Sequence, residues 1–285
     1  MNQKNDIQSL LQWGQKRLVE AGKTNARQEA FLLLQQASGF SKIKLMTETQ
    51  TELDTKAAEQ YAAFLNERCA GRPLQYILGE WEFMGLPFLV GEGVLIPRAD
   101  TEILVESVLE KGKQYHFQTG LDIGTGTGCI PISLEKYGNF KMMAVEISPQ
   151  ALAYAQKNNV CNQTKVQFLQ SDLYTAIPKE TKFDFIVSNP PYIETAEIED
   201  LMEEVRVYEP HNALDGGTDG LDFYRRILEQ AQDFLKNDGW IFFEIGCTQR
   251  KDLLQLLEQT GFDSLESRQD LAGLDRVVMG RKKGV

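Results

Sequence analysis

The segment Asn189-Pro190-Pro191-Tyr192 combines residue types that can hold a planar polar group in a fixed place. Its prolines fix the backbone φ angle and cannot donate a backbone hydrogen bond, so they end the apolar run before them. Asn189 stands before a proline, which biases its backbone towards an extended conformation. A carboxamide oxygen and a backbone carbonyl held in this way can accept hydrogen bonds from an –NH2 group. An aromatic ring beside them can stack on the flat group that carries this –NH2.

The apolar run at 183–187 indicates a buried strand that ends just before this segment. In open α/β sheets, ligands bind at the carboxyl ends of strands, which is where the segment would then lie. An Asn-Pro pair alone is equally typical of an ordinary turn. The functional interpretation therefore depends on what the rest of the chain places beside it.

Strand and helix patterns alternate over residues 119–285, which predicts an α/β fold with a mostly parallel sheet and helices on both faces. We expect strands near 119–123, 141–146, 166–170, 183–188 and 240–245, and a closing antiparallel pair near 263–268 and 276–280. Helices are expected between these strands, among them one near 149–158 and one near 221–235.

Residues 1–75 carry apolar side chains at helical spacing, which predicts a small all-helical domain of three helices. Gly39 would close the second helix, and Asp54 would cap the third. Such a domain can be plain scaffold or a docking module for a partner. We favour docking, because an α/β enzyme core does not need an added helical domain.

Residues 76–97 alternate aromatic or apolar residues with others around Gly85-Leu86-Pro87, which predicts a β-hairpin with its turn there. A helix is expected to follow it, with Asp100 or Thr101 as its cap. The hairpin would therefore link the helical domain to the α/β domain.

The chain of 285 residues has a net charge of −11 that is unevenly distributed. Residues 1–75 hold 10 Lys and Arg against 8 Asp and Glu, whereas the remainder holds 20 against 33. A strongly acidic body is a poor surface for phosphate groups. This charge argues against DNA or free RNA as the substrate, and it leaves open a contact through the near-neutral N-terminal residues.

No stretch approaches the roughly 18–20 apolar residues of a membrane span, and the N-terminus lacks the pattern of a signal peptide. The four cysteines are scattered without a Cys-x-x-Cys pair, which predicts neither a metal site nor a disulfide framework. We therefore expect a cytoplasmic protein that has no metal and no membrane partner.

A glycine-rich loop, Gly124-Thr125-Gly126-Thr127-Gly128, follows the first predicted strand of the sheet. Its glycines allow the backbone to approach a ligand closely and to adopt positive φ angles. The spacing differs from Gly-x-Gly-x-x-Gly, whose third glycine would fall on Cys129. The loop therefore does not favour a nicotinamide or flavin dinucleotide.

Three acidic residues stand near the ends of the first three strands of this sheet. Glu146 could accept hydrogen bonds from both hydroxyls of an adenosine ribose. Asp172 could accept from an adenine amino group, with Leu173 packing on the ring, and Asp122 could hold a cationic amino group directly or through water. A ligand with an ammonium group, a ribose and an adenine but no phosphate describes S-adenosylmethionine.

Together these motifs resemble the class I S-adenosylmethionine-dependent methyltransferases, and more narrowly the protein-(glutamine-N5) methyltransferases that modify peptide chain release factors. The resemblance covers nearly the whole chain. Beyond the motifs already described, it rests on Gly79-Glu80-Trp81-Glu82-Phe83-Met84-Gly85, Val94-Leu95-Ile96-Pro97-Arg98, Glu209-Pro210, Ala213-Leu214-Asp215-Gly216-Gly217 and Asp270-Leu271-Ala272-Gly273-Leu274-Asp275-Arg276. The chain departs from the family pattern at Ala99, where proline is usual, and at Leu173, where a bulky aromatic is common.

The resemblance implies a Rossmann-like sheet of seven strands with a small N-terminal helical domain joined by a β-hairpin. The expected boundaries are 1–75 for the helical docking domain, 76–97 for the hairpin and 98–285 for the methyltransferase domain. The substrate would be the glutamine of the Gly-Gly-Gln motif in a release factor. The protein would act as a monomer without a nucleic-acid substrate.

The resemblance also assigns site residues. Asn189, Pro190, Pro191 and Tyr192 would hold the substrate glutamine, and Asn189, Pro190 and Tyr192 would act in catalysis. The cofactor would contact Asp122, Gly124, Thr125, Gly126, Thr127, Gly128, Glu146, Asp172, Leu173 and Asn189. Arg98, Thr101 and Glu209 would either touch a ligand or brace the surrounding loops.

Three other functions remain open on the residues alone. A ribosomal-protein glutamine would fit the same site chemistry, so only the N-terminal domain and hairpin could distinguish that substrate. An adenine N6 or guanine N2 amino group is also an –NH2 on a planar system, but the acidic body disfavours a nucleic acid. A non-catalytic interaction protein with a vestigial cofactor fold would not need the acids and the Asn-Pro-Pro-Tyr segment together.

Overall fold

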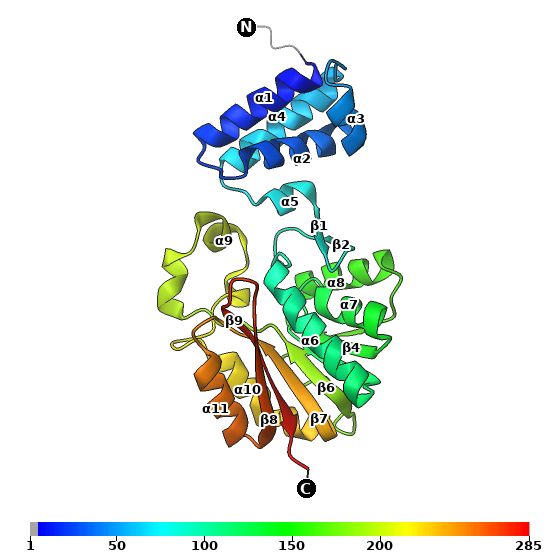
Figure 1. The fold of residues 1–285 in the computed structure, drawn as a ribbon, viewed down its shortest axis with the longest axis vertical. Helices are drawn as coiled ribbons and strands as arrows, with labels where there is room; N and C mark the ends of the chain where they lie inside the picture. Colours follow the sequence, from blue (N-terminus) through cyan, green and yellow to red (C-terminus); the bar gives the residue numbers. More distant parts are fainter. Residues whose placement is uncertain (1–4, 285) are drawn as a thin grey trace. The chain divides into compact units, whose positions relative to one another are not determined.

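The computed structural model describes residues 5–284, which divide into two compact units. The helical unit contains the chain up to Glu80 together with Met202–Tyr208. The sheet unit contains Trp81–Leu201 and the chain from Glu209 onwards (Figure 1). The chain first passes between them at Glu80–Trp81, inside the segment 76–97 that the sequence marks as a linker. Over the described residues, no helix is both long and apolar enough to span a membrane.

The helical unit is built from the three predicted helices and two shorter ones. They are α1 (Ile7–Glu20), α2 (Ala26–Ser38), α3 (Lys42–Thr47), α4 (Thr55–Cys69) and α5 (Leu74–Leu78). Asp54 caps α4 by accepting the N–H of Ala57 at 2.7 Å, and Gly39 ends α2 in the left-handed conformation, both as predicted. The sequence did not predict α3 and α5, because helices of six and five residues show no clear apolar stripe.

One short helix of the helical unit comes from far along the chain. The helix α9 (Glu203–Tyr208) places Glu204 against the buried guanidinium of Arg68, with an Nη1–Oε2 distance of 2.5 Å. Arg68 also donates from Nε and Nη2 to the two carboxylate oxygens of Glu29, at 2.7 and 3.1 Å. Tyr208 donates its hydroxyl proton to the carbonyl of Ala70. These contacts join Met202–Tyr208 to the first helices of the chain.

The sheet unit contains a sheet of seven strands in the order β5-β4-β3-β6-β7-β9-β8. The strands are β3 (Thr119–Ile123), β4 (Lys141–Glu146), β5 (Gln167–Gln170), β6 (Phe183–Ser188), β7 (Leu235–Glu244), β8 (Phe262–Gln269) and β9 (Asp275–Lys282). The first five are parallel, and β9 runs antiparallel to both β7 and β8. This confirms the Rossmann-like sheet of seven strands that the resemblance implied.

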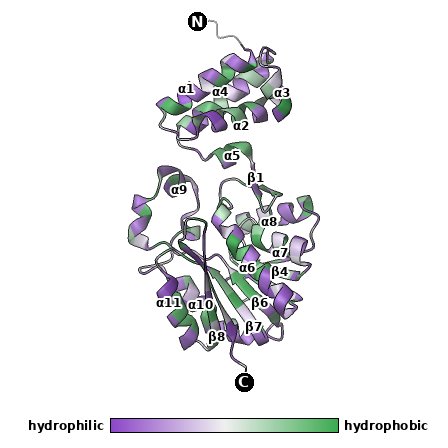
Figure 2. Ribbon diagram, in the orientation of Figure 1, coloured by the Kyte–Doolittle hydropathy of each residue, from purple (hydrophilic) through white to green (hydrophobic). Residues whose placement is uncertain are grey.

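Helices cover both faces of this sheet, with α6, α7 and α8 on one side and α10 and α11 on the other (Figure 1). They are α6 (Ala99–Tyr115), α7 (Cys129–Gly138), α8 (Pro149–Cys161), α10 (Asp222–Phe234) and α11 (Arg250–Gln259). Val105 of α6 packs in one core with Phe185, and Tyr224 of α10 packs in the other with Ile186. The apolar strand β6 between these cores stands out in Figure 2. Burial on both faces explains why its sequence is mostly apolar, with only the partly buried Asp184 interrupting the run from Phe183 to Val187.

The predicted hairpin forms as β1 (Glu80–Phe83) and β2 (Leu86–Leu89), but its turn lies earlier than predicted. Met84 and Gly85 form the turn with φ angles of 53° and 71°. Two positive φ angles match the twist of a two-residue hairpin. Leu86 and Pro87 therefore lie in β2, so the predicted turn at Gly85-Leu86-Pro87 is wrong by about one residue.

The start of α6 also differs from the prediction. The helix begins at Ala99, directly after an extended Arg98, and no side chain caps it. Asp100 and Thr101 lie inside its first turn, so the prediction that either of them caps the helix is wrong. Alanine enters a helix readily, which moves the start of the helix ahead of both candidates. Thr101 is buried in consequence.

The strand order reverses between β3 and β6. Successive strands extend from β3 towards β5 on one side, whereas β6 and β7 lie on its other side. A crevice opens at the carboxyl ends of the strands at such a reversal, and ligands bind there in open α/β sheets. The glycine-rich loop follows β3, and the Asn189 segment follows β6. The fold therefore brings the two sequence motifs to one crevice.

Candidate active site

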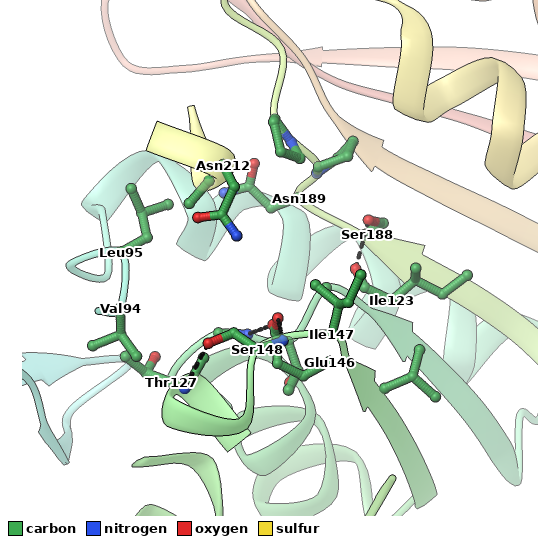
Figure 3. Close-up of a pocket in the computed structure, with 18 of the residues that line it drawn as sticks. Val94, Leu95, Ile123, Thr127, Glu146, Ile147, Ser148, Ser188, Asn189 and Asn212 are labelled. Atoms are coloured by element: carbon green, nitrogen blue, oxygen red, sulfur yellow. Dashed lines mark hydrogen bonds between the residues drawn. The ribbon is translucent and has the colours of Figure 1, made fainter. Parts of the chain in front are cut away.

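A cavity lies at this crevice, and both motifs line it (Figure 3). Of the residues assigned from the sequence, its lining includes Arg98, Thr101, Gly124, Thr125, Gly126, Thr127, Glu146, Asp172, Leu173, Asn189, Pro190 and Pro191. Asn189 and Asn212 lie on one side of the cavity in Figure 3, opposite Glu146 and Ser148. Asp122, Gly128, Tyr192 and Glu209 are not among the residues that line it.

The glycine-rich loop has room beside it for a ligand. Gly124 and Gly126 have φ angles of 73° and 55°, and a Cβ added to either would meet no atom within 4 Å. The loop's own backbone N–H groups point elsewhere: Gly124 and Thr125 donate to the carbonyl of Val145, and Gly126 donates to Glu146. A phosphate cradle needs free N–H groups. The loop therefore fits a ligand without phosphate.

Asp122 lies fully buried at the base of this loop. The pKa of its carboxyl is raised to about 7, mainly by burial and in part by the charge of Glu146, while the Thr125 hydroxyl opposes the rise. The hydroxyl lies close enough to act on the carboxyl, but neither carboxyl oxygen has a partner with hydrogen-bond geometry. Burying such a group is costly, and a nearby ammonium group would offset that cost. Since Asp122 does not line the cavity, its predicted contact with the amino end of S-adenosylmethionine, directly or through water, stays a prediction.

Glu146 ends β4 and is held in place by the backbone. Its Oε2 accepts the N–H of Gly126 at 2.9 Å, and its Oε1 accepts the N–H of Ser148 at 2.9 Å. Each carboxylate oxygen can accept more than one hydrogen bond. The side chain is therefore oriented towards the cavity and can still accept the hydroxyls of a ribose.

Asp172 and Leu173 follow β5 at the wall of the cavity. The carboxylate of Asp172 accepts from Nη2 of Arg226 at 2.8 and 3.0 Å, and it remains half exposed. Leu173 has a φ of 47°, which is unfavourable for a residue with a side chain, and the hydroxyl of Ser171 donates to its carbonyl. The loop thus holds a strained leucine at the place predicted for the adenine ring.

Asn189, Pro190 and Pro191 line the other end of the cavity, directly after β6. Nδ2 of Asn189 donates to the Thr101 hydroxyl at 3.3 Å. Tyr192 packs partly against the core, and burial raises the pKa of its phenol to about 12. Its predicted stacking on the substrate therefore stays a prediction.

The loop at 214–220 and Gln249 brace the backbone of this segment. Ile193 donates its N–H to the carbonyl of Leu214, and Gln249 donates from Nε2 to the carbonyl of Tyr192 at 2.9 Å. A Cβ added to Gly216 would lie 2.8 Å from the carbonyl oxygen of Pro191, and one added to Gly220 would lie 2.4 Å from that of Tyr192. Only glycine allows the backbone to approach this closely at Gly216 and Gly220. This explains why glycine stands at the first position of the Gly216-Gly217 pair.

Arg98 and Glu209 form an ion pair that links two walls of the site. Nη2 of Arg98 lies 2.5 Å from Oε1 of Glu209, whose carboxylate is buried and also accepts the N–H of Ile96 at 3.4 Å. Pro210, which follows, lines the cavity together with Arg98. The pair thus holds the segment before α6 against the segment that follows α9.

Several lining residues were not predicted from the sequence. Asn212, Phe223 and Arg226 line the cavity, and the buried Glu244 lies near Thr101 and Tyr192. A lone acid within the apolar run at 240–245 was the available signal for Glu244. The roles of the others depend on tertiary contacts that no local pattern shows. Within residues 5–284, no group of three or more His, Cys, Asp and Glu side chains could hold a metal ion.

The site therefore has two chemically distinct ends. Acidic side chains and open glycine backbone stand at one end, which suits a cationic, adenosine-like ligand. The Asn189 end presents a neutral carboxamide and proline backbone, which suits a neutral –NH2 group.

Two family models match the chain. The PrmC N-terminal domain model matches residues 9–79, and the methyltransferase small domain model matches residues 98–219. The release factor glutamine methyltransferase of Geobacter sulfurreducens is 42% identical over 276 residues, which cover 96% of each chain. That of Clostridium acetobutylicum is 40% identical over 264 residues, covering 90% of this chain and 92% of the relative.

A solved structure of a methyltransferase from Pyrococcus furiosus matches the fold with a TM-score of 0.53 at 20% identity. The match covers 80% of this chain and 98% of the other. At that level of identity, the similarity supports the fold and carries no information on the substrate.

Proposed function

Because the chain belongs to the release factor glutamine methyltransferase family, we propose that it methylates the side-chain amide nitrogen of the glutamine in the Gly-Gly-Gln motif of a peptide chain release factor. The chain is a methyltransferase of the class I fold, and S-adenosylmethionine is its methyl donor. The proposal concerns the exact acceptor and the residues that act on it.

The position of Asn189 is the observation that supports this proposal most directly. Its neutral carboxamide lies at the end of β6, in the same cavity as the open glycine loop and Glu146. A neutral acceptor suits a neutral –NH2 group, whereas a carboxylate there would select a cation. A planar primary amide is therefore the acceptor that this end of the cavity fits.

When bound, S-adenosylmethionine supplies an electrophilic methyl group on a positively charged sulfur. The residues of the chain must make a poor nucleophile reactive, because the lone pair of an amide nitrogen is delocalised into its carbonyl. The side-chain oxygen of Asn189 and the backbone carbonyl of Pro190 accept the two N–H groups of the glutamine. This aims the nitrogen and places partial negative charge beside the positive charge that develops on it. Fixing the reactants in this way can account for roughly 7–11 kcal/mol of the barrier.

No strong general base is assigned, because the nitrogen becomes much more acidic once it is alkylated and can lose its proton afterwards. On the cofactor side, Asp122 holds the amino end, Glu146 the ribose, and Asp172 with Leu173 the adenine. Tyr192 stacks on the glutamine amide through the part of its ring that stays outside the core.

The protein partner is a release factor, and residues 1–75 serve to dock it. We further propose that the enzyme acts as a cytoplasmic monomer and that it does not take a nucleic acid as substrate. The acidic sheet unit supports the last point, because it would repel a phosphate backbone.

The direct test incubates the protein with isotope-labelled S-adenosylmethionine and a purified release factor, followed by peptide mass spectrometry. We expect one added methyl group on the Gly-Gly-Gln glutamine. Parallel reactions contain ribosomal proteins, ribosomal RNA and a release factor with Gln→Ala at this position. Label on ribosomal protein or RNA, or full labelling of the Gln→Ala factor, would contradict the proposal.

A further inference from the structure

Two buried polar side chains lie beside Asn189 at the carboxyl edge of the sheet. Thr101, in the first turn of α6, is 2% exposed, and Glu244, the last residue of β7, is 1% exposed. β6 and β7 are parallel and pair Ser188 with Phe243, so Asn189 and Glu244 follow at the same level. α6 brings Thr101 to the same point, where its hydroxyl accepts a hydrogen bond from Nδ2 of Asn189 at 3.3 Å and lies close enough to the Glu244 carboxyl to lower its pKa. Oε2 of Glu244 has no partner with hydrogen-bond geometry.

The charge on Glu244 favours one orientation of the Thr101 hydroxyl. An ionised carboxylate only accepts, so the Thr101 hydroxyl turns its single proton towards Glu244 when that carboxyl is ionised. The Thr101 oxygen is then an acceptor, and Nδ2 of Asn189 donates to it at 3.3 Å. Since the oxygen and nitrogen of a carboxamide lie on opposite sides, Oδ1 of Asn189 must point away from Thr101.

We propose that Thr101 and Glu244 are positioning residues that orient the Asn189 carboxamide so that its oxygen faces the substrate amide, an inference that rests on the proposed function. Without this acceptor, the carboxamide could turn by half a rotation and present Nδ2 to the glutamine –NH2. Two donors would then face each other, and the acceptor that orients the nitrogen would be lost. The arrangement is a strong restraint, because rearranging a buried polar network leaves groups without partners.

Protonation of Glu244 releases this restraint, because a neutral carboxyl can donate to Thr101 and let its hydroxyl donate to a rotated Asn189. Burial raises the pKa of Glu244 to about 7, and the hydrogen bond from Thr101 partly opposes the rise. The charged and titratable groups that act with Glu244 are Arg276 of β9, Asp100 of α6, Arg98 before α6, Tyr192 after β6, Tyr224 of α10 and Cys129 of α7. Glu244 therefore changes charge near neutral pH.

The test compares Thr101→Val, which keeps the shape but removes the hydroxyl, with Thr101→Ser, which keeps the hydroxyl. Both are assayed with the release factor and S-adenosylmethionine at saturation, and calorimetry measures their cofactor affinity. We expect Thr101→Val to lower kcat by about tenfold or more at unchanged cofactor Kd, somewhat less than losing the Asn189 contact itself. Thr101→Ser should restore kcat to near the wild-type value.

The pH profile gives a second readout that does not depend on how the Thr101 variants fold. The kcat of the wild type should fall below about pH 7, following the protonation of Glu244. Glu244→Gln, which cannot ionise, should have a lower kcat that is independent of pH over this range.

The positioning role would be overturned if Thr101→Val had the same kcat as the wild type, or if Thr101→Ser and Thr101→Val were equally impaired. It would also be overturned if the kcat of the wild type did not change with pH. A wild type that binds the cofactor but does not methylate the release factor would instead overturn the proposed function. Activity of the wild type is measured first, so the two failures are distinguished.

Discussion

Replacing Asn189 by alanine removes the carboxamide acceptor at the end of β6 while leaving the glycine loop and Glu146 in place. We expect cofactor affinity to be largely retained and kcat to fall by about 10²-fold or more, the scale of losing one preorganised polar contact. Calorimetric titration and transfer of a tritiated methyl group measure the two quantities. Asn212→Ala is the matched control, because Asn212 lines the same cavity but is exposed. If both variants are impaired equally, the loss reflects the shape of the cavity and Asn189 has no special role.

Cofactor binding should depend on pH through Asp122, because only an ionised carboxylate attracts the ammonium group. Its pKa is raised to about 7 by burial, so the carboxyl of the free protein is mostly protonated below that pH. The affinity for S-adenosylmethionine should therefore fall by about tenfold for each pH unit below 7. Calorimetry across this range measures it, and Asp122→Asn should bind weakly with no such dependence. A pH-independent wild-type affinity would refute the assignment.

The raised pKa of Asp122 also affects the stability of the ligand-free protein, which should fall as pH rises, whereas cofactor affinity should increase. The folded-state pKa of Asp122 lies above its ordinary value of 3.8, so the folded state binds more protons than the unfolded state between these pH values. The free energy of unfolding therefore decreases as pH rises from about 4 to about 7. Asp122→Asn should melt at a higher temperature than wild type above pH 7, and the difference should vanish towards pH 4.

Much of the site was predictable at the level of residues. A single glycine loop or a single acid after a strand is a weak signal, but three acids after successive strands beside a glycine loop are specific. The structure brings Glu146, Asp172 and Asn189 to one cavity. Arg226 could not be predicted, because its place at the site depends on a helix far away in the sequence. The lone acid in the apolar run at 240–245 marked Glu244, but the residues beside it depend on strand register. The Arg226–Asp172 pair joins residues 54 positions apart.

The close packing of the loop at 214–220 on the Asn189 segment can be tested at Gly220. Gly220→Ala places a Cβ 2.4 Å from the carbonyl oxygen of Tyr192 and requires a left-handed residue, because φ is 69°. We expect a stability loss of roughly 1–2 kcal/mol from the backbone strain alone. The clash should also displace the Tyr192 backbone and lower kcat by at least about tenfold, since small misplacements are costly in catalysis.

Gly273→Ala separates these two effects. Gly273 has a φ of 80°, but a Cβ there would meet no atom within 4 Å. Thermal unfolding of this variant should show a similar loss of stability with normal turnover. If Gly220→Ala also keeps normal kcat, the loop does not position the Asn189 segment.

Among the elements, the buried central strands were the most predictable. β3, β4 and β6 match their expected ranges, because strands covered on both faces are rich in apolar residues. β7 begins five residues before its predicted start at Trp240, since its first residues, Leu235–Gly239, include polar ones that no apolar pattern reveals. The helix α9 was missed because six residues with none buried carry no stripe.

For the molecule as a whole, the least predictable feature is the membership of α9 in the helical unit. Arg68 makes the buried ion pair of this contact, and its side chain is 5% exposed between Glu29 and Glu204. Arg68→Met would leave Glu29 buried without a partner and should destabilise this unit by about 3–5 kcal/mol. Hydrogen exchange of the α1, α2 and α4 amides reports on this unit separately.

Two variants bracket the effect of Arg68→Met. Glu204→Gln should have a smaller effect, because its side chain is 30% exposed, and it should speed exchange mainly in α9. Lys16→Met breaks only an exposed pair with Glu20 and should change stability by less than about 1 kcal/mol. Equal exchange rates in Arg68→Met and Lys16→Met would show that the buried cluster does not stabilise the unit.

The docking role proposed for the helical unit can be tested separately from catalysis by the choice of substrate. A groove lined by Leu11, Phe31 and Met46 runs between α1, α2 and α3, and Met46 is 63% exposed. Polar residues such as Gln15 and Gln28 also line this groove. Met46→Glu would place a charge among its apolar side chains, so a docked protein would lose contact area and gain a desolvation cost. We expect the KM for an intact release factor to rise about tenfold, with kcat/KM for a short Gly-Gly-Gln peptide unchanged, because the peptide lacks the rest of the factor that would dock. Val19→Glu is the matched control, since Val19 is 59% exposed on α1 and does not line the groove. Equal KM values for the two variants with the intact factor would place the docking surface elsewhere.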